Sequence, residues 1–358
     1  MNEYIIYRQG TFESFYDTPI EVNWPITDMC NYRCSYCFGQ RPIEKERFSS
    51  LKQIEVAVSN IAKLRHNRIM VTLAGGEPTL HPYFYDILRL LKENLQERLK
   101  TVLIITNGSR NQELYEQIAA LGEEINIKVE ISIHTEYVNM DHIVNLIKMM
   151  SPKINLEFPL MFNPEKRETV HKIFNELLEL RKNNPFHLIV QTLRQPPNFD
   201  VLDCRYTEDD FRWQRDATQQ FEEVSRSSVS NIRREEWENA FPKTFFWDIE
   251  DKEGRKIITD LDRNKAFQIG LLNFKGMFCT MGSSILSIGP DGTCRKVHCP
   301  VDTKTHNIFE DIDAEEMNKT YLLKCPYENC GCGTNHPVPK FLDENEAITF
   351  IKTHFPPN

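Results

Sequence analysis

Along the first half of the chain, segments with a strand-like pattern of apolar residues alternate with segments that have a helix-like pattern. Short runs rich in Val and Ile predict buried strands, and stretches with an apolar residue every three to four positions predict amphipathic helices. The predicted strands are Ile20–Ile26, Ile69–Leu73, Val102–Ile105, Val129–Ile133, Ile154–Leu160 and His187–Leu193. The predicted helices are Ser50–Leu64, Tyr83–Leu99, Gln112–Leu121, Val138–Met149 and Glu165–Arg181.

Six strand–helix units of this kind predict an α/β fold with a parallel sheet, either open and doubly wound or curled into part of a barrel. Each polar or glycine-rich segment follows a predicted strand: CNYRCSYC the first, AGGEPT the second and TNGS the third, while SIHTEY ends the fourth. Ligand chemistry in parallel α/β folds collects at the C-terminal ends of the strands. We therefore expect these segments to meet at one mouth.

From about residue 198 to residue 273 the pattern gives way to charged and aromatic segments. Glu253-Gly254 within this stretch predicts a hairpin turn. We expect a connector or a lid, whose aromatic residues would fill small cores or, in a lid, touch substrate; the core role is the commoner one. The aromatic residues concerned are Trp213, Phe245, Phe246 and Trp247.

The composition narrows the class of protein. The 358 residues are 40% hydrophobic, which suffices for a core, and no apolar run has the length of a membrane span. The first residues lack the pattern of a secretion signal, so we expect a cytoplasmic protein with no membrane partner. A net charge of −9 and a pI near 5.7 argue against nucleic acid as a partner.

Ten cysteines in a chain without a secretion signal are more typical of metal binding than of disulfides. Cys204 stands alone, and we expect it to be a small buried or half-buried apolar residue. The other nine form two groups: Cys30, Cys34 and Cys37, then Cys279, Cys294, Cys299, Cys325, Cys330 and Cys332.

The first group has the spacing Cys-x3-Cys-x2-Cys, with Tyr36 before the last cysteine. Thiolates are the ligands of iron–sulfur clusters, and three of them leave one iron of a four-iron cluster without a protein ligand. The alternative is a zinc site completed by a distant ligand such as His81. Zinc sites favour paired Cys-x2-Cys motifs, which this loop fits less well.

This loop, with GGEP at residues 75–78, resembles the signatures of the radical S-adenosylmethionine (SAM) superfamily, and the resemblance covers about residues 20–195. It implies a partial (β/α)6 TIM-like barrel in which Cys30, Cys34 and Cys37 hold a [4Fe-4S] cluster with an open iron that SAM chelates. An external one-electron reductant of the flavodoxin or ferredoxin type would then trigger SAM cleavage to a 5′-deoxyadenosyl radical, which abstracts hydrogen from substrate. Cofactor chemistry of this kind leaves positioning and protection to the protein.

The resemblance also implies SAM contacts at several strand ends. Two glycines would let the backbone approach the ligand closely. Ser132 and His134 share one face of their strand, so both could reach the ribose, although His134 stands where relatives commonly have an acidic or amide residue. Asn155, Glu157 and Arg194 are weaker candidates for substrate or SAM contact. The predicted cofactor-binding residues are Tyr36, Gly75, Gly76, Glu77, Asn107, Ser132 and His134.

The second cysteine group resembles the SPASM or shorter twitch extension of radical SAM enzymes, which holds auxiliary clusters. Six thiols complete one four-cysteine cluster but not two, so the resemblance implies one auxiliary [4Fe-4S] cluster. Cys294 is the expected spare, and the alternative is a structural zinc ribbon using the same thiols. The expected ligands come from Cys279, Cys299, Cys325, Cys330 and Cys332.

We expect a core barrel over residues 1–195, a connector or lid over 196–275 and a cluster domain over 276–358. Relatives of this layout mostly modify peptides, by cross-linking, epimerisation or oxidation, and a smaller group dehydrogenates or epimerises sugars or aminocyclitols. A peptide is the favoured substrate, although only about thirty residues precede Cys30, too few for the leader-binding domain of many peptide modifiers. A non-catalytic zinc-binding protein is the alternative from another class.

Overall fold

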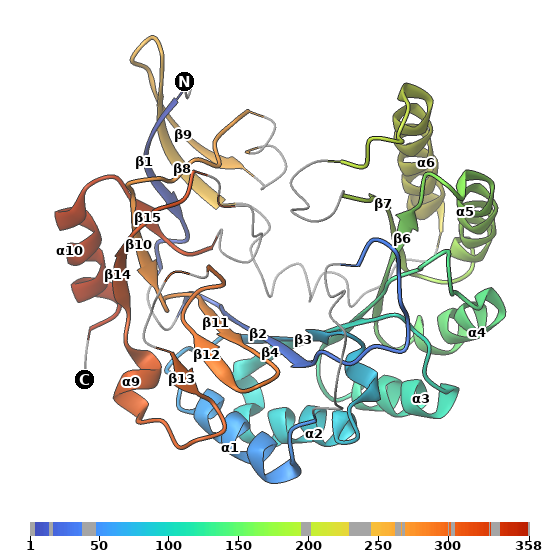
Figure 1. Ribbon diagram of the computed structural model, residues 1–358, viewed down its shortest axis with the longest axis horizontal. Helices are drawn as coiled ribbons and strands as arrows, with labels where there is room; N and C mark the ends of the chain where they lie inside the picture. The colour runs from blue at the N-terminus through green and yellow to red at the C-terminus, as the bar shows by residue number, and fades with distance from the viewer. Residues whose placement is uncertain are drawn as a thin grey trace.

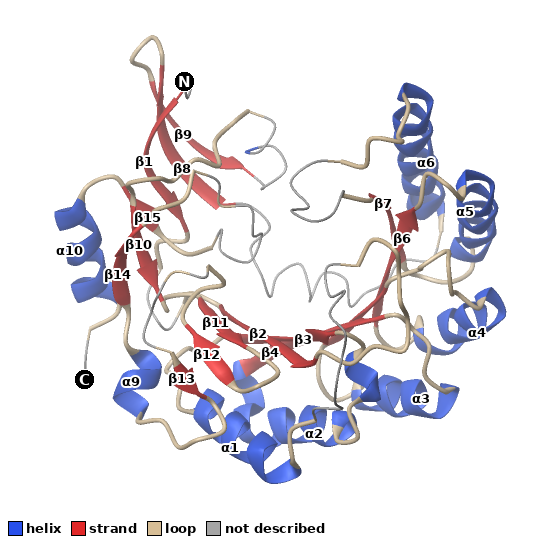
Figure 2. Cartoon of the chain, in the orientation of Figure 1, coloured by secondary structure: helices blue, strands red, loops and turns tan. Residues whose placement is uncertain are grey.

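The computed structural model describes residues 4–13, 17–37, 48–194, 202–228, 245–261, 266, 269–299, 301, 305–328, 330 and 337–356. Most of these residues lie in two sheets and in helices that cover them (Figures 1 and 2). The strands of the larger sheet are β2 (Ile20–Thr27), β3 (Ile69–Gly75), β4 (Leu99–Thr106), β5 (Ile127–Ile131), β6 (Asn155–Phe162), β7 (His187–Thr192), β11 (Ile285–Ile288), β12 (Thr293–Arg295) and β13 (His306–Asn307).

The larger sheet is curved, and helices α1 to α5 cover its convex side (Figure 1). Its strand order is β13-β12-β11-β2-β3-β4-β5-β6-β7, and every pair from β11 to β7 in this order is parallel. These helices are α1 (Leu51–Ala62), α2 (Phe84–Leu95), α3 (Gln112–Leu121), α4 (Met140–Met150) and α5 (Arg167–Arg181), with 3-10 helices η1 (Pro78–Leu80) and η2 (Gln96–Arg98). The predicted strand–helix units are all present, which confirms the partial barrel.

Side-chain alternation along β2 shows why the sheet takes this form. Val22 and Trp24 are fully buried and belong to the core between sheet and helices, whereas Glu21 lies on the opposite, concave face. Helix α1 begins after Ser50, which forms a capping box with Gln53. Local sequence thus determines where α1 begins and which face of β2 is apolar. The apolar faces of the sheet and of the helices then pack against each other.

Six strands of the described chain form the second sheet, in the order β14-β10-β15-β1-β8-β9. The N-terminal strand β1 pairs with β8 and β15, while β11 joins the larger sheet beside β2. The two sheets therefore do not divide at the boundaries expected near residues 195 and 275. The strands of this sheet are β1 (Tyr4–Gly10), β8 (Phe245–Asp251), β9 (Lys256–Leu261), β10 (Phe278–Met281), β14 (Tyr321–Lys324) and β15 (Lys340–Phe341).

The connecting region contains helix α6 (Glu208–Ser227) and the β8–β9 hairpin, whose predicted turn at Glu253-Gly254 is confirmed. The indole of Trp213 stacks on His171 with 4.1 Å between ring centroids. Trp247 is fully buried in the second sheet's core. These two tryptophans fill cores and do not form a lid, and the side chain of Phe245 lies outside the described residues.

The C-terminal part of the chain is joined to the barrel through helix α1. The Asn60 side-chain amide donates to the carbonyls of Ile308 and Glu310 at 2.9 and 2.7 Å, and its oxygen accepts the N–H of Ile312 at 3.1 Å. Helices α9 (Ala314–Asn318) and α10 (Glu344–His354) complete this part. In the described part of the chain, no helix has the length and apolarity needed to span a membrane.

Candidate active site

The first cysteine loop leaves the C-terminal end of β2 at the concave side of the sheet. Cys30 is half-buried, Cys34 is buried and Cys37 is exposed. The Cys37 N–H donates to the Cys34 carbonyl at 3.1 Å, which makes a turn that places these two cysteines together. The chain after Cys37 lies outside the described residues until Phe48.

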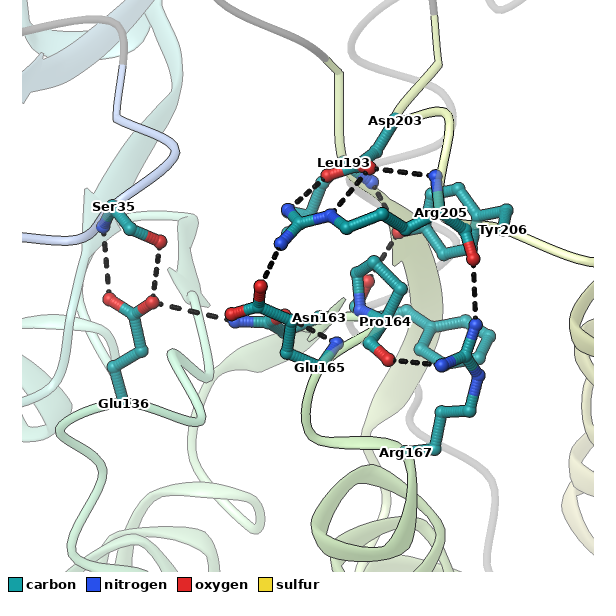
Figure 3. Close-up of polar contacts among 11 residues, drawn as sticks. Ser35, Glu136, Asn163, Pro164, Glu165, Arg167, Leu193, Asp203, Arg205 and Tyr206 are labelled. Atoms are coloured by element: carbon teal, nitrogen blue, oxygen red, sulfur yellow. Dashed lines mark hydrogen bonds and ion pairs between the residues drawn. The ribbon is translucent and has the colours of Figure 1, made fainter.

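Residues beyond the end of β5 bind this loop. The Glu136 carboxylate accepts hydrogen bonds from the Ser35 N–H at 3.0 Å and from the Ser35 hydroxyl at 2.6 Å. Glu136 also accepts from the Asn163 amide at 3.4 Å, and Figure 3 shows it between the two residues. The Tyr137 hydroxyl donates to the Arg33 carbonyl at 2.9 Å. The loop is therefore bound by residues that follow β5, and Asn163 after β6 supports Glu136.

Tyr36 and His134, two of the predicted cofactor-binding residues, contact each other. The Tyr36 hydroxyl and the His134 Nδ1 are 3.0 Å apart, and the rings are stacked with centroids 5.8 Å apart. Burial lowers the pKa of His134 to about 4, so the imidazole is neutral near pH 7. Ser132, on the same face of the chain, is buried, and its N–H donates to the Thr106 carbonyl at 2.8 Å.

The two glycines of the GGEP segment make their close approach to the chain itself. A Cβ on Gly75 would lie 2.0 Å from the Thr27 carbonyl oxygen, and one on Gly76 would lie 2.2 Å from the Met29 carbonyl oxygen. Gly75 also has a φ of +139°, which favours glycine. The glycines thus let β3 pack on the start of the cysteine loop, and their approach to a ligand stays a prediction.

Glu77 is fully buried and acts as a bridge between strand ends. Its carboxylate accepts from the Thr106 hydroxyl at 2.7 Å and from the Asn107 N–H at 2.6 Å, and also binds Thr79. Burial raises the pKa of Glu77, whereas these hydrogen bonds lower it. The carboxylate is occupied by the protein, so Glu77 positions Asn107 rather than pointing at a free ligand surface.

Asn107 lies beside the first thiol. Its side-chain amide donates to the Asn31 oxygen at 2.9 Å and lies 3.8 Å from the Cys30 sulfur. The Tyr32 N–H is also directed to this sulfur, at 3.4 Å. Hydrogen bonds to a cluster's sulfur ligands are one means by which a protein tunes such a site.

Burial raises the pKa of Cys34 to about 12, and the charges of Glu136 and Cys37 act in the same direction. Burial likewise raises the pKa of Cys30. Without a metal these thiols are protonated at neutral pH, so metal loading must displace protons. Among the described residues, no three His, Cys, Asp or Glu side chains surround a single point as one metal ion would require. Thiolates are the ligands of four-iron clusters, so the donor chemistry of these cysteines fits such a cluster.

Charged side chains line the concave face of β5 and β6. Glu130 and Glu157 are paired in register, and the Lys128 Nζ lies 2.9 Å from a Glu157 oxygen. Burial raises the pKa of Glu130 to about 7, and the Glu157 charge adds to this. Glu130, Ser132 and His134 alternate with buried residues along one chain, so Glu130 lies deeper in the barrel than the cysteine loop.

The described cysteines of the second group divide in two. Burial raises the pKa of Cys279 to about 12, and the charges of Cys330, Cys299 and Cys325 act in the same direction, so these three thiols lie around Cys279. Cys294 instead packs in the core of the larger sheet. Cys332 lies outside the described residues, and the lone Cys204 is exposed, so the expectation that it is buried or half-buried is wrong.

The weaker candidates have other surroundings. Asn155 is buried at the start of β6, far along the strand from the cysteine loop, and Arg194 forms an isolated bridge with Leu202 after β7. Glu136, Tyr137 and Asn163 were not predicted as site residues, yet they hold the loop. SIHTEY contains the first two, so the signal that could have found them is a carboxylate two residues beyond His134.

Parts of the chain are similar to known proteins. Residues 24–158 match the family model described as Radical SAM superfamily. The chain is 39% identical over 87 residues to a GTP 3′,8-cyclase of Photorhabdus laumondii, covering 24% of this chain and 25% of that protein. It is 28% identical over 187 residues to a GTP 3′,8-cyclase of Pasteurella multocida, covering 49% and 53%. The chain thus spans between a quarter and about half the length of these curated relatives.

A solved structure described as tagged anSMEcpe with bound AdoMet has a similar fold. The TM-score is 0.50 at 16% identity, and the similarity covers 95% of this chain and 85% of that one.

Proposed function

Residues 24–158 form a radical SAM domain, and from this premise we propose that the chain is an enzyme that cleaves SAM reductively and abstracts hydrogen from a substrate C–H bond. The observation that carries the proposal is the cysteine loop bound to the ends of β3, β4 and β5. A [4Fe-4S] cluster and SAM would supply a 5′-deoxyadenosyl radical, and the protein supplies positions and shielding.

The chain's own residues would do the following. Cys30, Cys34 and Cys37 hold the cluster as thiolates, and the exposed Cys37 leaves that side open to a small molecule. Asn107, fixed by Glu77, donates toward the Cys30 sulfur. The cofactor-contacting roles proposed for the backbone at residues 75–76 and for Ser132 and His134 rest on their place at neighbouring strand ends.

We propose one auxiliary [4Fe-4S] cluster at Cys279, Cys299, Cys325 and Cys330. The proximity of these thiols supports this set over one that includes Cys294. Electrons for both clusters would come from an external one-electron reductant. We also propose that function divides into core barrel, connector and cluster domain as expected, except that β1 belongs with the cluster domain and β11 to β13 with the barrel.

For the substrate we propose a peptide, with a sugar or aminocyclitol as the alternative. The curated relatives are named for GTP, which carries a triphosphate. Glu157 is paired with Lys128, and Glu130, whose pKa is raised to about 7, adds negative charge to this pair once it ionises, which opposes a triphosphate and favours an amine.

Anaerobic reconstitution tests the proposal. The protein should gain iron and sulfide at two clusters per chain, and with dithionite it should convert SAM to 5′-deoxyadenosine. Absence of both results would leave the non-catalytic zinc-binding alternative. GTP, lysine-containing peptides and aminocyclitols are then supplied in separate reactions and analysed by mass spectrometry. Turnover of GTP would overturn the proposed substrate class while leaving the radical chemistry intact.

A further inference from the structure

Lys340 is a buried lysine beside the second thiol group. The residue is 2% exposed and lies on β15, opposite Cys279 of β10 in one ladder and opposite Gln9 of β1 in the other. Residues opposite each other in an antiparallel pair direct their side chains to the same face. Lys340 and Cys279 therefore face the same side of the second sheet.

Neutral groups hold the Lys340 ammonium in place. Its Nζ donates to the Val338 carbonyl at 2.9 Å and to the Gln9 side-chain oxygen at 3.2 Å, and it lies 4.9 Å from the centre of the Phe274 ring. A buried ammonium is costly unless negative charge compensates it. Hydrogen bonds to a carbonyl and an amide fix its position on the face that it shares with Cys279.

The opposite charge is available at the thiols. Burial raises the pKa of Cys279, and the positive charge of Lys340 is the largest influence in the other direction. Four thiolates around a four-iron centre carry a net negative charge, and net charge near the cluster is one of the factors that set its reduction potential. Lys340 therefore places a buried positive charge on the face of the second sheet that carries Cys279.

We propose that Lys340 is the internal counter-charge of the auxiliary cluster and raises its reduction potential, an inference that rests on the proposed cluster at Cys279, Cys299, Cys325 and Cys330. Reduction adds one negative charge to the cluster. A nearby fixed cation stabilises the reduced form more than the oxidised form, so its removal makes the cluster harder to reduce.

The test is a potentiometric titration of the reconstituted full chain, followed by electron paramagnetic resonance. Addition of SAM should change only the signal of the cluster with the open iron, which assigns the two signals. Lys340→Met should lower the equilibrium constant for reduction of the auxiliary cluster at least about tenfold, equal to about 59 mV for one electron. The first cluster's potential should stay as in the wild type.

Lys296→Met is the matched control, because Lys296 is also buried but faces Cys294, the spare thiol. It should leave both potentials unchanged. Gln9→Glu is a second variant, for use if Lys340→Met does not fold. A carboxylate at this position would neutralise the ammonium without removing it, so this variant should also lower the potential of the auxiliary cluster. An unchanged potential in either Lys340→Met or Gln9→Glu would overturn the inference. A wild-type protein that loads only one cluster would instead overturn the proposed auxiliary site itself, and the inference with it.

Discussion

The cysteine loop after β2 and the thiol group of the second sheet are held by different means. The loop donates hydrogen bonds to Glu136 and accepts them from Tyr137 and Asn107, which lie beyond the ends of neighbouring strands, and Cys37 remains exposed. In the second group Cys279 and Cys330 are buried and Cys299 and Cys325 are half-buried, with a buried lysine opposite Cys279. The first site therefore has an exposed thiol at its edge, whereas the four thiols proposed for the second site are buried or half-buried.

This difference indicates a division of labour between the two sites. An accessible edge suits exchange of a small molecule such as SAM, whereas an enclosed, charge-compensated site suits a cluster with a complete set of protein ligands. The four predictions below test this division, beginning with the largest expected effect.

Alanine at Cys30, Cys34 or Cys37 should abolish formation of 5′-deoxyadenosine, because the radical depends on this cluster. Alanine at Cys330 should retain SAM cleavage but stop product formation from the substrate. Chromatography of 5′-deoxyadenosine and mass spectrometry of the product measure the two activities. The division would be wrong if Cys330→Ala lost SAM cleavage while keeping the wild-type content of the first cluster.

Cys299→Ala should reduce the iron content of the reconstituted protein by about half, since it removes a ligand of one of two four-iron clusters. Cys294→Ala is its matched control and should retain full iron content, at a cost of about 1 kcal/mol in stability for a small change in a packed core. Iron and sulfide analysis distinguishes the two variants. Equal iron loss in both would place Cys294 among the ligands.

The sequence predicted most of the barrel and the strand end from which the first cysteine loop leaves, for identifiable reasons. The strands and helices of the barrel show regular periods of apolar residues. The three cysteines of the first group lie within the eight consecutive residues CNYRCSYC. The pairing of β1 with β8 and β15 joins segments that are far apart in the chain, so no local sequence pattern predicts it.

The roles of individual site residues were harder to predict than their location. Gly75 and Gly76 are at the site as expected, but what they approach is the backbone of Thr27 and Met29, a contact that exists only once β2 and β3 are paired. Glu77 likewise finds its partners on β4. Motif spacing locates such residues, whereas strand pairing decides what they bind.

Glu136→Gln should loosen the cysteine loop without removing any ligand. Hydrogen bonds to a charged group contribute about 1.5–3 kcal/mol, and the low end applies at this exposed position. We therefore expect about a tenfold faster loss of iron from the first cluster to a chelator. The nearby Glu165→Gln is the control, because the Glu165 carboxylate binds Arg205 and not the loop (Figure 3). Equal rates in Glu136→Gln and wild type would show that this contact does not hold the site.

Glu21 on β2 tests whether pH loosens the first site, and it has the smallest expected effect on the clusters themselves. Burial raises the pKa of Glu21 to about 7 from 4.5. The folded state therefore binds more protons than the unfolded state between these values, so the contribution of Glu21 to stability falls as pH rises from about 4.5 to 7 and stays low above it. The loss is at most about 3 kcal/mol.

Glu21→Gln keeps the size of the side chain and removes this ionisation. Relative to wild type, the variant should gain stability at pH 8 compared with pH 5, because only the wild type must ionise a buried carboxyl group. Anaerobic urea unfolding at the two pH values measures the difference, and other titrating groups cancel between the two proteins. Since β2 leads into the cysteine loop, the iron of the first cluster should also be retained longer in the variant at pH 8. A stability difference that is the same at pH 5 and pH 8 would mean that Glu21 does not ionise with this shift, and that the polar face of β2 imposes no pH dependence on the open site.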